Sequence, residues 1–226
     1  MAEPTITFGD ADSIFGTQPG WNPGGSTVNV KKSRASTIGG KGNETDSKLY
    51  DETTDASQNF NAASDSAPTV PETVGALAGS YILTSISINT AATEFHKMTL
   101  AGHNHAVNAH ADTLQQGKHG ITLASGFGAE DFLGGTAGDS ASVESSSVTI
   151  TVSHVDSIGG ATGAHVVGDN YTGMITATVT WIGTPTTPAA AGWDVTESPL
   201  TKGNTAHARH TYTGTKAFDL AAPSEE

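Results

Sequence analysis

Cysteine is absent from this chain of 226 residues. Neither a disulfide framework nor a thiolate metal site can therefore form. No run approaches the roughly 20 apolar residues that a helical membrane span needs, and the N-terminus lacks the basic and apolar regions of a signal peptide. We therefore expect a chain that is made in the cytoplasm and has no membrane partner.

Basic residues are few and unevenly placed. No lysine or arginine occurs between Lys118 and Lys202, and the formal net charge is −13. Such a surface repels nucleic acid and anionic membranes. Half of the basic residues lie between Lys31 and Lys48 without interleaved aromatic residues, which makes a poor platform for nucleic acid. We expect this group, and in particular Lys31, Lys32 and Arg34, to pair with acidic side chains of a neighbouring subunit; a solvated face is the alternative.

Apolar, aromatic and charged residues are all scarce, at 35%, 6% and 15% of the chain, while glycine occurs 27 times. Charged residues normally make up about a quarter of a protein. This composition predicts a thin core, a neutral hydroxyl-rich surface and long loops. Such a surface suits a subunit that packs against many neighbours.

Alternating apolar and hydroxyl residues predict β-strands. The clearest examples are Ser80–Asn89 and Ser145–His154. We expect 46–61 to pair as a hairpin with 26–32, 95–101 to pair with 80–89, and a single helical turn to lie within 68–79. The predicted strands are 26–32, 80–89, 95–101, 145–154, 172–182 and 206–215.

These elements predict an all-β fold, an antiparallel β-sandwich or barrel with long Gly-rich loops and an extended N-terminal arm. We assign 1–25 to the arm, 26–220 to a single β domain with a long loop insertion near 101–142, and 221–226 to a short acidic tail. The arm is rich in Gly and Pro, yet it carries Phe8, Ile14, Phe15 and Trp21. Four such side chains are too apolar for a solvated tail, so we expect them to form an assembly interface.

A histidine cluster is the main chemical feature. His103, His105 and His110 follow an HxHx4H pattern, and on a strand the first two would share a face. Three imidazoles can hold a divalent transition metal with one open position. The alternative is a polar loop that is rich in histidine. We favour the second interpretation and expect neither a metal nor another cofactor.

No pattern indicates an enzyme. The Gly-rich stretch 134–138 lacks the lysine of a phosphate loop, and no nucleophile elbow occurs. Trp193 could stack on a sugar in a carbohydrate-binding β-module, although a lone Trp more often anchors a loop. Such a module, or a His-metal protein, remains an alternative function.

Several runs follow one another along the chain: Val28-Asn-Val-Lys-Lys, Ser57-Gln-Asn-Phe60, Gly79-Ser-Tyr-Ile-Leu-Thr-Ser-Ile-Ser-Ile-Asn89, Glu94-Phe-His-Lys-Met-Thr-Leu100 and the closing run Thr211-Tyr-Thr-Gly-Thr-Lys216. This layout resembles that of tail tube proteins of tailed bacteriophages. The resemblance covers about half of the chain and lacks a diagnostic motif. The His- and Gly-rich middle departs from the pattern.

The resemblance implies a virion structural protein whose subunits form stacked rings around a DNA conduit, in contact with other virion proteins. A capsid coat or decoration protein is the alternative within the same class. An acidic lumen would let DNA pass without specific binding, because it offers no gain from counterion release. Alternatively, the acidity only keeps the free subunit soluble. The expected lumenal carboxylates are Glu130, Asp131, Asp139, Glu144, Asp156 and Asp169.

Overall fold

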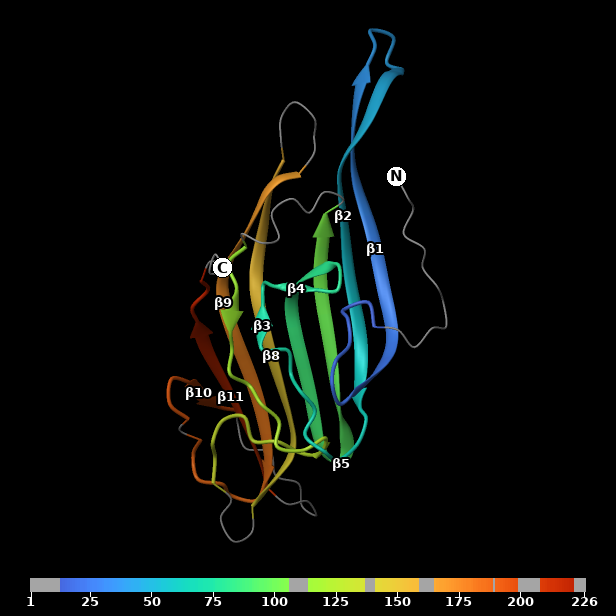
Figure 1. Ribbon diagram of the computed structural model, residues 1–226. Helices are drawn as coiled ribbons and strands as arrows, with labels where there is room; N and C mark the ends of the chain where they lie inside the picture. The colour runs from blue at the N-terminus through green and yellow to red at the C-terminus, as the bar shows by residue number, and fades with distance from the viewer. Residues whose placement is uncertain are drawn as a thin grey trace.

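The chain folds as an all-β protein, as predicted (Figure 1). The computed structural model describes residues 13–105, 114–136, 141–158, 165–188, 190–198 and 208–221. The strands are β1 (Trp21–Ile38), β2 (Glu44–Ala62), β3 (Thr73–Val74), β4 (Leu77–Ala78), β5 (Tyr81–His105), β6 (Gly117–Lys118), β7 (Phe127–Gly128), β8 (Ser142–Ile158), β9 (His165–Ile182), β10 (Asp194–Glu197) and β11 (Arg209–Phe218).

The described residues contain no helix. The helical turn expected within 68–79 is therefore wrong, and that segment holds the short strands β3 and β4 instead. Gly75 and Gly79, both at positive φ, set the turns on either side of β4, which is a conformation that favours glycine. No helix of the described residues is long and apolar enough to cross a membrane.

One large antiparallel sheet makes up most of the fold. Its strand order is β1-β2-β5-β8-β9-β11-β10, with β4 and β7 also paired to β5, while β3 and β6 form a separate two-stranded sheet. The expected pairing of 46–61 with 26–32 is confirmed, because β2 pairs with β1 along nearly its whole length. Both strands are longer than predicted, since their polar outer halves carry no apolar alternation.

Strand β5 folds back on itself. Its first half pairs with β8 through Ser85–Ala91, and its second half pairs with β2 through Lys97–His105. The Thr84 hydroxyl donates to the Ala101 carbonyl at 3.2 Å. Residues 17 apart in an extended strand would lie more than about 50 Å from each other, so the chain must reverse between them. The predicted hairpin of 80–89 with 95–101 is thus correct, and Figure 1 shows the two halves side by side.

The sheet buries one face and leaves hydroxyl groups on the other. Its buried face carries Phe60, Ile86, Ile88, Met98, Leu100, Val148, Ile150, Ile175, Val179, Trp181 and Tyr212. Loops and the short strand β3 cover this face, with Val70, Val74, Leu123 and Leu133 in contact with the core. Across the opposite face, hydroxyl pairs join neighbouring strands, such as Thr180 with Thr211 at 3.2 Å. The thin core predicted from composition therefore lies between one large sheet and the segments that pack on its buried face.

The N-terminal segment belongs to this core. Phe15 and Trp21 are only 1% and 6% exposed. The buried Gln58 amide fixes the segment, because its Oε1 accepts from the Ile14 amide at 2.9 Å and from the Ser13 hydroxyl at 3.2 Å. The expectation that Phe15 and Trp21 cover a neighbouring subunit is wrong, since the chain's own sheet buries both side chains. Ile14 packs against the same core, and Phe8 lies outside the described residues.

Two hairpins extend beyond the body of the sheet. Strands β1 and β2 continue past the last pair between β2 and β5, Thr53 with His105. From Thr53 to Glu44 the hairpin reaches about 30 Å further at ~3.3 Å per residue. Strands β8 and β9 similarly continue past Thr151, the last residue of β8 that pairs with β5. Figure 1 shows the β1–β2 hairpin rising well above the other strands.

Candidate functional site

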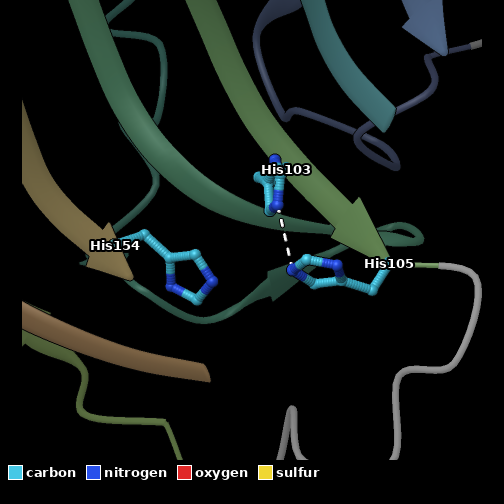
Figure 2. Close-up of side chains that lie close together, drawn as sticks. All are labelled: His103, His105 and His154. Atoms are coloured by element: carbon cyan, nitrogen blue, oxygen red, sulfur yellow. Dashed lines mark hydrogen bonds between the residues drawn. The ribbon is translucent and has the colours of Figure 1, made fainter. Parts of the chain in front are cut away.

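Three histidines converge where the hairpins leave the sheet. His103 and His105 lie at the end of β5, and His154 lies on β8. One ring nitrogen from each lies within 4.8 Å of the other two. The Nε2 atoms of His103 and His105 are 3.0 Å apart. Figure 2 shows the three rings pointing toward a common centre from two strands.

The cluster includes two of the three histidines expected from sequence. His103 and His105 do share a strand, and their ring centroids are 4.6 Å apart. His154 supplies the third ring, with its centroid 5.4 Å from that of His103. His110 lies outside the described residues. Local spacing could not reveal His154, because only the fold-back of β5 and its pairing with β8 bring these positions together.

Polar neighbours fix two of these rings. His103 Nδ1 lies 2.7 Å from the Asp55 carboxylate, to which it donates, and Asp55 and His103 are partners in the β2–β5 register. His154 Nδ1 lies 2.6 Å from the Asn170 Oδ1 oxygen, to which it likewise donates. These two bonds orient the Nε2 side of each ring toward the centre of the cluster.

The partners are themselves held in place. The Asn170 amide is 3% exposed and donates to the carbonyls of Gly75 and Gln115 at 3.2 and 2.9 Å. Burial raises the pKa of Asp55, but hydrogen bonds from Lys31 and His103 outweigh it and lower that pKa overall. Asp55 therefore remains a carboxylate, which accepts a hydrogen bond from His103.

Three other histidines, His96, His119 and His210, have polar partners elsewhere in the chain. His119 Nε2 donates to the Pro71 carbonyl at 2.6 Å while its Nδ1 accepts from the Ile121 amide. Burial lowers the pKa of His119 and so favours this neutral ring. His96 is fully buried 3.4 Å from Glu130, and His210 lies 2.8 Å from Glu197.

Several of the carboxylates expected in a lumen have partners within the chain. Glu130 Oε1 accepts from the amides of Ala124 and Ser125, both at 3.1 Å, so its carboxylate organises a loop, and a lumenal position stays a prediction for it. Asp131 is half-buried and accepts from the Leu133 amide at 3.0 Å. Glu144 forms a two-bond ion pair with Arg209.

The three remaining carboxylates expected in a lumen are Asp139, Asp156 and Asp169. Asp169 is exposed on β9, where a lumenal position stays a prediction. Asp139 and the side chain of Asp156 lie outside the described residues.

The basic group lies on the β1–β2 hairpin. Lys31 pairs with Asp55, Lys32 with Glu52 at 3.0 Å, and Arg34 with Glu44, all across the hairpin. These cations therefore have partners in their own chain, and contacts with a neighbouring subunit stay a prediction for them. Exposed pairs of this kind contribute only about 0–1 kcal/mol each.

Trp193, the residue considered for sugar stacking, is half-buried beside Gly214 and packs against the core. Its position is that of a loop anchor. No family model matches this sequence, and no curated protein matches it.

Proposed function

We propose that this chain is a virion structural protein, a tail tube subunit that assembles into stacked rings around a DNA conduit. The observation that carries the proposal is the β1–β2 hairpin, which extends about 30 Å past the sheet as two strands alone. It exposes Ile38 and Leu49 at 72% and 60%. An isolated two-stranded hairpin has at best marginal stability in water. We therefore expect this hairpin to pack against another surface.

The interactions within the hairpin do not replace such a surface. Its ion pairs are exposed and weak. Its apolar side chains Ile38 and Leu49 are exposed and do not pack against the core of the subunit. Burying Ile38 and Leu49 on a neighbour would contribute roughly 1.5–3 kcal/mol each before ordering costs. Repeated around a ring, this contact supplies a head-to-tail interface of the kind that closes into rings or stacks into tubes.

The second hairpin and the edges of the sheet support the same proposal. Val155 and Tyr171 are 50% and 53% exposed where β8 and β9 leave the sheet. Among the described residues, β1 and β10 each pair on one side only, and such edges pair readily with other chains. The net charge of −13 suits a conduit through which DNA moves without binding.

The test replaces the two exposed apolar side chains at the hairpin with serine, as I38S/L49S, in the full chain. Sedimentation velocity should show assembled species for the wild type and mainly single subunits for the variant. The matched control is L77S, which removes an apolar side chain that is 46% exposed on the short strand β4. It should assemble as the wild type does.

Equal assembly of I38S/L49S and the wild type would refute the role given to the hairpin. Closed shells or trimers in place of rings would favour a coat or decoration protein. A wild type that stays monomeric and binds glycan would favour a carbohydrate-binding module.

A further inference from the structure

We propose that His103, His105 and His154 bind one divalent transition metal of the Zn²⁺ class. Imidazole nitrogen is a preferred ligand of Zn²⁺, Ni²⁺ and Cu²⁺. The three rings come from two strands, and their candidate ligand nitrogens lie within 4.8 Å of one another. Metal binding does not depend on the proposed assembly function.

The spacing of the nitrogens suits a metal after a small adjustment. Two imidazoles on a tetrahedral ion at 2.0–2.1 Å have nitrogens about 3.3 Å apart. The Nε2 atoms of His103 and His105 are 3.0 Å apart, slightly closer than this. The other separations are at most 4.8 Å, so they need to shorten by no more than about 1.5 Å to reach the same value.

The second layer of residues matches that of protein metal sites. Ligating histidines usually donate their other ring N–H to a carboxylate or carbonyl oxygen, which fixes the tautomer and presents the opposite nitrogen to the ion. Asp55 accepts such a hydrogen bond from His103 Nδ1 at 2.7 Å, and Asn170 Oδ1 accepts one from His154 Nδ1 at 2.6 Å. His105 is only 3% exposed, which shields the site from solvent on one side.

The location gives the ion a structural role. Asp55 and His103 are register partners close to Thr53–His105, the last pair before the β1–β2 hairpin leaves the sheet. His154 lies three residues past Thr151, where β8 and β9 continue without β5. A bound ion would therefore join the end of β5, which pairs with the base of the β1–β2 hairpin, to the base of the β8–β9 hairpin. A fourth position open to water completes the coordination.

The experiment is isothermal titration of the tag-free full chain with ZnCl₂ alone, after treatment with a chelator. We expect one Zn²⁺ per chain and a rise in melting temperature of several degrees on saturation. H154A should weaken binding at least 10-fold. N170A should weaken it by about 10- to 100-fold, as loss of a residue that positions a ligand does. The matched control is H210A, because His210 is partnered with Glu197 on another strand; it should bind as the wild type does.

A spectroscopic measurement on the wild type keeps the proposal testable if H154A fails to fold. In ¹⁵N spectra of the imidazole side chains, Zn²⁺ should shift the signals of His103, His105 and His154 and leave those of His96, His119 and His210 unchanged. Absence of saturable binding by the wild type, or equal affinity of H154A and H210A, would overturn the proposal. So would shifts confined to the other histidines. Each outcome leaves the hairpin experiment on assembly unaffected.

Discussion

Removing the Phe15 ring by Phe15→Ala should strongly destabilise the isolated subunit. The ring is 1% exposed and packs against Tyr81, with ring centroids 5.5 Å apart. It also covers Gly102, where an added Cβ would lie 2.7 Å from the Phe15 ring. The glycine thus lets the N-terminal segment approach β5 closely, and alanine at position 15 would leave a cavity over this contact.

The size of the effect follows from burial and cavity formation. Loss of a fully buried Phe costs about 3–5 kcal/mol, because the transfer free energy and the cavity add. This is a large part of the 5–15 kcal/mol by which domains are usually stable. A chain of this size loses about 2–4 °C in melting temperature per kcal/mol. We therefore expect a fall of about 10 °C.

Urea unfolding of the dissociated subunit measures this loss directly. The control is Phe127→Ala, because Phe127 is 42% exposed and contacts mainly Phe95; it should cost about 1 kcal/mol. A loss below about 1 kcal/mol for Phe15→Ala, equal to the control, would refute the placement of 13–21 in the core. Such a result would instead support the expectation that this segment is an arm available for assembly.

Two further predictions concern loops over the core. Gly75→Ala should cost about 2–4 kcal/mol in thermal unfolding, because Gly75 has φ +82° and an added Cβ would lie 2.5 Å from the Gln115 carbonyl. Gly120→Ala, at φ +69° with open space around it, should cost only about 1–2 kcal/mol; equal losses would contradict the steric argument. Burial raises the pKa of Asp131 above its usual 3.8, although backbone hydrogen bonds oppose this, so the native state binds this proton more tightly than the unfolded chain. The stabilisation from this protonated carboxyl is present below about pH 3.8 and is lost as the pH rises through the native pKa. Urea unfolding at pH 3 and 7 should therefore show that Asp131→Asn gains stability relative to the wild type as the pH rises. A stability difference that stays constant between the two pH values would contradict this prediction.

Strand positions were predictable where one face of a strand is buried. Apolar residues alternate with hydroxyl residues in 80–89 and 145–154. Because successive side chains of a strand point to opposite faces, this alternation correctly indicates a buried face, which carries Ile86, Ile88, Val148 and Ile150. The outer halves of β1 and β2 carry only isolated apolar residues such as Ile38 and Leu49, so no alternating pattern indicated these strands. The N-terminal segment was misassigned because its fixation depends on Gln58, a distant buried amide that local composition does not reveal.

The histidine cluster was predictable only in part. The i, i+2 spacing of His103 and His105 placed them on one strand face, which the structure confirms. His154 and the supporting residues Asp55 and Asn170 come from three other strands. Their convergence depends on strand order and register, and a single sequence carries no direct signal of either.

Cryo-electron microscopy of the purified full chain tests the assembly proposal most directly. The account predicts rings or stacked tubes in which the segment with Ile38 and Leu49 lies against the adjacent subunit. It also predicts a channel that is free of lysine and arginine clusters. Monomers throughout, or rings in which the β1–β2 hairpin projects into solvent without touching a neighbour, would contradict the account.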